Sequence, residues 1–208
     1  MKKNNKALRV AAGLAVAAML STCLVSGTFA KYTTSGNIVD SARVAKFGVE
    51  VAGNAGAFTD EYSSDNGLTV KSTGGDVVAP GTEGTFRANT ITGKPEVAVH
   101  VENSVVADLG ENWTVDGVYY CPLEVTVGAT TIKGTECTSV EDFENKIAAA
   151  VKKTSADYAP NADITAASTA ISWKWAFTGN DDAKDTKLGD AANATVSFNL
   201  TTTVTQVD

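Results

Sequence analysis

Histidine is nearly absent from this chain, and cysteine, proline and aromatic residues are scarce. The 208 residues include one histidine, three cysteines and four prolines, and aromatic residues make up 7%. The single imidazole, that of His100, excludes metal sites built on several histidines, including the two-histidine helix of zinc peptidases. Basic residues are also outnumbered, 17 against 24 acidic, for a net charge of -7. General nucleic-acid binders need a basic face, so the composition argues against that class.

The rest of the composition is that of a globular protein. Hydrophobic residues make up 43% and charged residues 20%, which differs from a disordered chain. The 18 glycines and the few aromatic residues favour a β-rich fold with many turns. The length predicts one domain, or at most two small ones.

The N-terminus has the pattern of a secretory signal peptide, expected over residues 1–30. An uncharged stretch over residues 10–30 follows four basic residues, Lys2, Lys3, Lys6 and Arg9. Small residues at Thr28 and Ala30 predict cleavage between Ala30 and Lys31. An uncleaved membrane anchor is an alternative, because the uncharged stretch is long enough to span a bilayer. A lipoprotein is another, because the residues before Cys23 nearly match a lipobox.

Cleavage after Ala30 would remove four of the 17 basic residues and no acidic one, leaving a net charge of -11. Such a surface keeps a protein soluble and repels anionic polymers. We expect the protein to be secreted, at the cell surface or in the extracellular matrix. Residues 31–41 are polar and are expected to form an N-terminal arm.

Alternating apolar and polar residues predict about nine strands in a single domain over residues 42–208. Asp116-Gly117 predicts a type I′ hairpin turn, and a second hairpin is expected to turn at Gly128-Ala129. The remaining strands are predicted at 42–51, 68–71, 85–91, 96–106, 170–177 and 194–206. In the strand at 170–177 we expect four side chains to point inward: Ile171, Trp173, Trp175 and Phe177. The prediction is a mostly β, jelly-roll-like β-sandwich.

One helix is expected to interrupt the strands, over residues 138–156. Thr138 or Ser139 can cap its N-terminus, and Glu141 or Asp142 would complete a capping box. An apolar stripe with helical spacing predicts the buried face: Val140, Phe143, Ile147, Ala150 and Val151.

Two cysteines remain after signal cleavage, Cys121 and Cys137, and they flank the second hairpin almost symmetrically. A disulfide across the strand ends is therefore plausible in an exported protein. Two separate buried thiols are the alternative.

Candidates for chemistry are few. His100 lies between Glu96 and Glu102 on the polar face of a predicted strand. We interpret it as a surface histidine rather than a general base. A cluster of side chains with oxygen atoms could bind calcium: Asn180, Asp181, Asp182 and Asp185. Their spacing differs from that of a calcium-binding loop, so we interpret the cluster as a solvated acidic loop. Trp173 and Trp175 are interpreted as core residues rather than a sugar platform. No catalytic residue and no cofactor are predicted.

The N-terminal region nevertheless carries a recognisable pattern. Thr28-Phe29-Ala30 is followed by Lys31-Tyr32, and Asp40-Ser41-Ala42-Arg43-Val44-Ala45-Lys46-Phe47 comes shortly after. This block resembles the start of TasA- and camelysin-like biofilm-matrix proteins of Gram-positive bacteria, which leave the cell through a SipW-type signal peptidase. The later Val78-Ala79-Pro80-Gly81-Thr82 resembles the turn that these proteins carry before a strand.

The resemblance implies a jelly-roll subunit that polymerises into extracellular fibres by donor-strand exchange. The donor arm would then be residues 31–40, with Lys31, Tyr32, Ile38 and Val39 among its residues; a disordered terminus is the alternative. Implied partners are further copies of the chain, the signal peptidase, and an accessory matrix protein or exopolysaccharide. A surface adhesin or glycan-binding module is the second hypothesis. The metallopeptidase activity implied through camelysin finds little support, because the chain has no H-E-x-x-H motif.

Overall fold

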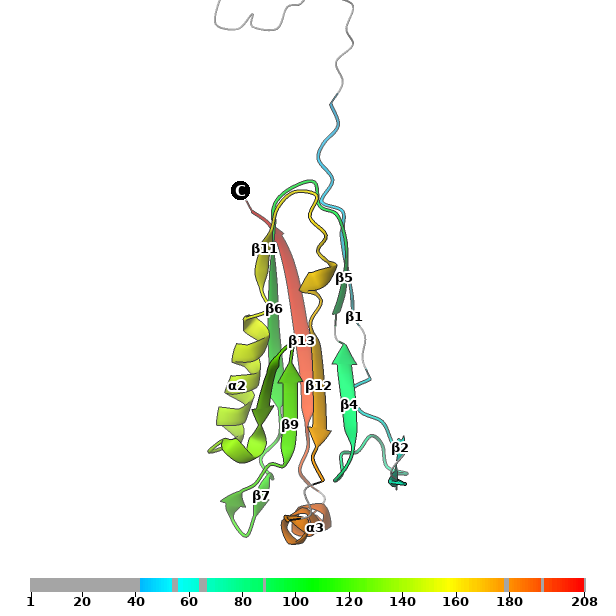
Figure 1. The fold of residues 1–208 in the computed structure, drawn as a ribbon, viewed down its shortest axis with the longest axis vertical. Helices are drawn as coiled ribbons and strands as arrows, with labels where there is room; N and C mark the ends of the chain where they lie inside the picture. The colour runs from blue at the N-terminus through cyan, green and yellow to red at the C-terminus, as the bar shows by residue number, and fades with distance from the viewer. Residues whose placement is uncertain are drawn as a thin grey trace, which may run out of the picture. The chain divides into compact units, whose positions relative to one another are not determined.

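The computed structural model describes residues 42–53, 56–63, 67–87, 89–177, 180–191 and 193–207. A compact unit begins at Val44. Its elements confirm the predicted mostly β fold, a β-sandwich with an inserted helix (Figure 1).

Two antiparallel sheets form the sandwich. The larger has the strand order β10-β9-β12-β4, with β4 at Glu83–Arg87, β9 at Leu123–Val127, β10 at Thr130–Lys133 and β12 at Ala170–Trp175. The smaller has the order β11-β6-β13, with β6 at Val99–Asp108, β11 at Ala156–Tyr158 and β13 at Ser197–Gln206. Strand β6 pairs with β13 along ten residues, from Val99 opposite Gln206 to Asp108 opposite Ser197.

Among the described residues there are also three two-stranded ladders: β1 (Val49–Gly53) with β5 (Asn89–Gly93), β2 (Glu61–Ser63) with β3 (Thr69–Lys71), and β7 (Thr114–Val115) with β8 (Val118–Tyr119). Both predicted hairpin turns are confirmed. Asp116 and Gly117 have φ of 54° and 77°, as a type I′ turn requires. Val127 pairs with Thr130, so Gly128-Ala129 forms the two-residue loop between β9 and β10. Short 3-10 helices lie at η1 (Gly134–Glu136) and η2 (Thr165–Ala167).

The core lies between the two sheets. Alternate residues of β6, β9 and β12 point inward and are buried. Trp173 and Trp175 are 2% and 4% exposed, which confirms their interpretation as core residues. Phe177 was expected beside them but is 70% exposed, because β12 ends at Trp175 and the chain leaves the sheet there.

Helix α2 (Val140–Lys152) is the predicted helix, shorter than expected at both ends. Half of the predicted capping box is confirmed: the Asp142 N–H donates to Ser139 Oγ at 3.1 Å, whereas the Asp142 carboxylate accepts at 3.0 Å from the N–H of Thr138, the residue before the N-cap. The helix packs along β6 and reaches β9 and β10. Its apolar stripe is buried there: Phe143, Ile147, Ala150 and Val151. Helix α2 therefore covers one side of the sandwich (Figure 1).

A second helix, α3 (Asp182–Ala191), lies where a polar loop was expected. That prediction was wrong because only one residue of α3, Leu188, is buried, and a single apolar residue leaves no stripe to detect in the sequence. Leu188 packs against the main core, which anchors the helix.

The predicted strands at 42–51 and 85–91 also differ in the structure. Gly48 has a φ of 57°, a left-handed conformation that breaks an extended strand, so β1 begins only at Val49. Val44 is consequently 91% exposed and Phe47 40% exposed. Where one strand was predicted at 85–91, the structure has two separate strands, β4 and β5.

Candidate functional site

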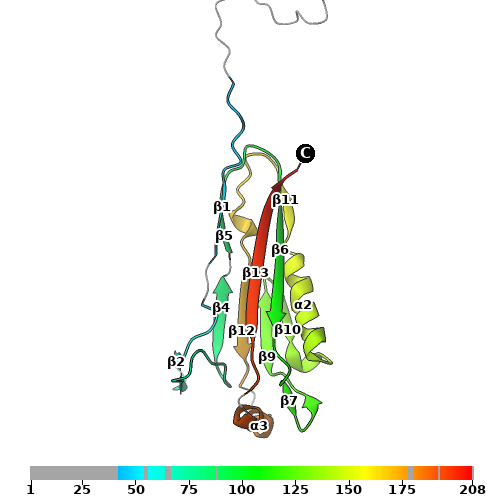
Figure 2. The same cartoon turned by 180° about the vertical axis from the view of Figure 1, so that it is seen from behind.

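The free edge of β13 is the feature of this unit best suited to bind another chain. Strand β13 pairs with β6 on one side, and within the described residues no strand pairs with the other side (Figure 2). An edge strand presents main-chain N–H and C=O groups to any extended segment that can align with them. The edge is long, because β13 spans ten residues.

The two faces of β13 differ in polarity. Small polar side chains point outward and are exposed: Ser197, Asn199, Thr201, Thr203 and Thr205. The inward side chains Phe198, Leu200 and Val204 are apolar and only half-buried. The inner face therefore keeps apolar area that an added strand would cover.

Strands β4 and β5 lie across the sandwich from this edge. The rings of Phe198 and Phe86 are 6.5 Å apart and nearly parallel. The Asn89 Nδ2 group donates to Thr202 Oγ1 at 2.5 Å, and Thr202 Oγ1 donates to Asn103 Oδ1 at 2.6 Å. The bond from Asn89 ties β13 to β5, whereas the bond to Asn103 joins β13 to its own sheet neighbour β6, so neither supplies a ladder partner for the free edge.

The ends of β13 lie at opposite ends of the unit. The Val207 N–H, just after β13, donates to Ala98 O, and the Glu96 N–H donates to Lys46 O. The first residues of the compact unit thus lie near the C-terminal end of β13, whereas the N-terminal end of β13 lies near α3 (Figure 2). The first residues of the compact unit and α3 are therefore at opposite ends of it.

Several predicted site residues precede the described residues. The cleavage site at Ala30 and Lys31 and the donor-arm residues Tyr32, Ile38 and Val39 all lie outside them. The cleavage site and the donor arm remain predictions.

The two predicted disulfide partners are free thiols in the structure, and both are buried. Cys137 Sγ donates to Lys133 O at 3.4 Å and accepts from Lys146 Nζ at 3.4 Å. Burial raises the pKa of Cys121 to about 12, so little of the thiolate needed for oxidation is present near neutral pH.

His100 forms an exposed pair in which its Nδ1 lies 2.6 Å from Asp157 Oδ1 on β11. Thr205 of β13 lies opposite His100 on the other side. This is the arrangement of a hydrogen-bonded pair on the surface of a sheet.

The predicted acidic loop is the start of α3. Asp181 Oδ1 lies 3.5 Å from Lys184 Nζ, and Asp185 Oδ1 accepts a hydrogen bond from the Tyr120 hydroxyl at 2.6 Å. Burial, and after it this bond, raise the pKa of the Tyr120 hydroxyl. Within the residues that the structure describes, no three acidic, cysteine or histidine side chains are grouped to hold a metal ion.

None of the helices in the described part of the chain is long and apolar enough to cross a membrane. A comparison of the chain with protein-family models, curated proteins and solved structures finds no match.

The free edge of β13 was not predictable from the strand pattern, because the pattern identified the strand but not its neighbours.

Proposed function

We propose that this protein is a secreted structural subunit that assembles into extracellular biofilm-matrix fibres by strand donation. The observation that carries the proposal is the free ten-residue edge of β13. Main-chain hydrogen bonds to an added strand would satisfy that edge. The role is structural and not enzymatic.

The donated strand is the arm of a second copy, residues 31–40. In an extended arm Tyr32 and Ile38 lie on one face, because they are six residues apart and side chains alternate with a period of two. These two side chains would cover the half-buried inner face of β13. The remaining arm residues are mostly small and polar, like the outer face of β13.

The ends of the compact unit favour an open chain of subunits. The unit begins near the C-terminal end of β13, while β13 itself begins at the other end, beside α3. Head-to-tail donation joins different surfaces of the two copies, and such contacts extend into filaments when they do not close into rings. With subunits aligned, the arm enters at the α3 end and runs antiparallel to β13, which places Ile38 near Phe198.

The resemblance of residues 27–49 to TasA- and camelysin-like proteins supports the same role. It implies export through a SipW-type signal peptidase, with cleavage after Ala30, and an accessory matrix protein or exopolysaccharide as a further partner.

Negative-stain electron microscopy of the chain beginning at Lys31 tests the proposal. We expect filaments after incubation at high concentration, and folded monomers without filaments when residues 31–40 are deleted. Ile38→Asp should prevent assembly because it places a charge on the buried face of the arm, whereas Asn37→Asp faces outward and should assemble. Filaments of unchanged length from the deleted chain would refute the arm as donor.

A further inference from the structure

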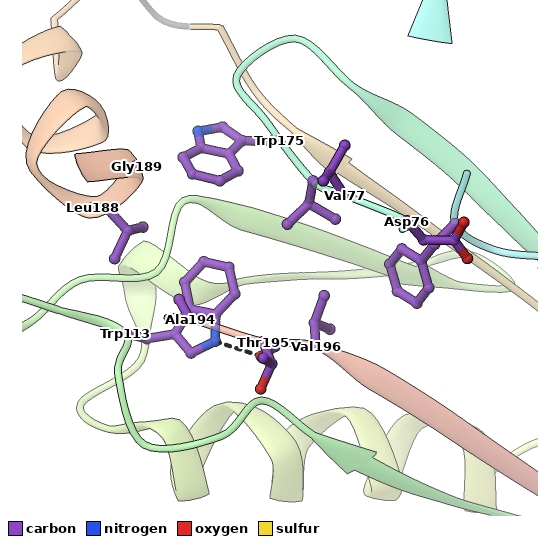
Figure 3. A pocket seen from close by; sticks show the side chains of 11 residues that line it. Asp76, Val77, Trp113, Trp175, Leu188, Gly189, Ala194, Thr195 and Val196 are labelled. Atoms are coloured by element: carbon purple, nitrogen blue, oxygen red, sulfur yellow. Dashed lines mark hydrogen bonds between the residues drawn. The ribbon is translucent and has the colours of Figure 1, made fainter. Parts of the chain in front are cut away.

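A separate apolar pocket lies at the α3 end of the unit. It has a volume of about 590 Å³, within the range of small-molecule sites. Its walls come from several separate segments of the chain (Figure 3): Phe58, Val77, Trp113, Trp175, Leu188 and Val196. The proposed function uses none of these side chains.

One wall of the pocket carries a polar group without a partner. The three indole N–H groups of the protein are all buried, and two of them are bonded: Trp113 donates to Thr195 O at 2.8 Å, and Trp173 donates to Ala57 O at 2.7 Å. Trp175 Nε1 is buried and has no hydrogen-bond partner within the residues that the structure describes. Buried donors are nearly always paired, so this N–H calls for an acceptor.

Helix α3 leaves space beside this indole. Gly189 lines the pocket, and a Cβ atom added there would meet nothing within 4 Å. In Figure 3 the nitrogen of Trp175 lies on the side of the ring that faces α3. Glycine is unfavourable inside a helix, and here it keeps the wall open next to the unpaired donor.

The charges around the pocket restrict its ligand. Asp76 is the one charged residue that lines it, and its side chain is exposed. The whole chain is also acidic, with a net charge of -7. An anionic acceptor such as a carboxylate is therefore repelled, and an ammonium group supplies no acceptor for Trp175 Nε1.

We propose that this pocket binds a small neutral molecule with an apolar body and one carbonyl oxygen. The apolar body lies against the aromatic walls, and the carbonyl oxygen accepts a hydrogen bond from Trp175 Nε1. Amides and esters with short alkyl chains have this chemistry.

Titration with octanamide of the Ile38→Asp variant of the chain beginning at Lys31, which should stay monomeric, followed by the three indole N–H resonances in nitrogen-15 NMR spectra, tests the proposal. Each resonance is assigned with a Trp→Phe variant. We expect octanamide to shift the Trp175 resonance and leave that of Trp173 in place, and to bind at least tenfold more tightly than octanoate or octylamine.

Two matched variants of α3 locate the site. Gly189→Leu adds bulk at a residue that lines the pocket and should abolish octanamide binding, whereas Ala191→Leu adds similar bulk at a residue that does not line it and should not. Trp175→Phe keeps most of the ring, and should weaken octanamide binding to the level of octylamine.

The proposal is overturned if octanamide leaves the Trp175 resonance unmoved up to its solubility limit, or if Gly189→Leu binds it as well as the parent chain does. Displacement of octanamide by a synthetic peptide of residues 31–40 would overturn it too, because the pocket would then belong to the assembly interface.

Discussion

On the side of the sandwich that α2 covers, Phe143, Ile147 and Val151 are fully buried, whereas on the β13 side Phe198, Leu200 and Val204 remain half-buried. Both sides are built from strands with the same inward-outward alternation. The α2 side ends in a helix whose apolar stripe replaces a further strand, and the β13 side ends in exposed main-chain groups. A covered side contributes stability within one chain, while an uncovered side leaves apolar area and hydrogen bonds for a second chain.

The largest difference between the two sides should appear in stability. Phe143→Ala removes a fully buried ring from α2 and should lower the free energy of unfolding by about 3–5 kcal/mol. Urea denaturation followed by circular dichroism measures the loss. A loss below about 1 kcal/mol would mean that α2 contributes little to the covered side.

The matched change on the other side is Leu200→Ala in β13. Leu200 is only half-buried, so we expect roughly 1–2 kcal/mol in the monomer, about half of what a fully buried leucine costs. In the proposed filament the same variant should cost more, because the donated arm would cover the position. Equal losses in monomer and filament would count against β13 as the acceptor edge.

The thiol on the α2 side should make stability depend on alkaline pH. Burial raises the pKa of Cys121 to about 12, from a usual value near 9. The folded chain thus holds this proton more tightly than the unfolded chain does. Stability from Cys121 is complete below about pH 9 and is lost as the pH rises toward about 12.

Urea midpoints measured at pH 8, 10 and 11 check this dependence. In the control variant Cys121→Ala, the decrease of the midpoint between pH 8 and pH 11 should be smaller. Burial also raises the pKa of Tyr119, so some dependence should remain in the control. A midpoint that rises between pH 8 and pH 11 would contradict the sign.

A smaller loss is expected at the N-terminus of α2. Ser139→Ala removes the acceptor for the Asp142 N–H and should cost about 1 kcal/mol. Ser139→Asn is the control, because the asparagine side-chain oxygen keeps an acceptor for the Asp142 N–H. Equal losses for the two variants would show that this acceptor is not what stabilises the helix end.

The smallest effect belongs to the exposed ion pair between Lys187 and Asp116, whose charged atoms are 2.6 Å apart. Lys187→Ala should change the free energy of unfolding by less than about 1 kcal/mol. Repeating the measurement in 1 M salt should remove most of the difference, since salt screens exposed charges. A loss as large as that of Phe143→Ala would mean that α3 is more firmly tied to the unit than its single buried residue indicates.

The sequence by itself determined the local structure wherever the signal was local. Asp116-Gly117 predicted a type I′ turn because that turn needs positive φ at both central residues, which aspartate and glycine adopt readily. Helix α2 was predicted because its apolar residues recur with the period of a helix. Alternation likewise identified β6, β12 and β13 as strands, because residues two apart share a face of the sheet. The acidic composition follows from the sequence in the same way.

Only the tertiary structure decided which strands are neighbours, because hydrogen bonds between strands join residues far apart in the chain. Val99 pairs with Gln206 and Val101 with Ala156, so β13 became an edge and β6 did not. The same reason hid the pocket, since Trp113, Trp175 and Gly189 meet only when three distant segments pack together. Side-chain patterns determine what each segment forms, and packing between distant segments determines which groups stay free to bind.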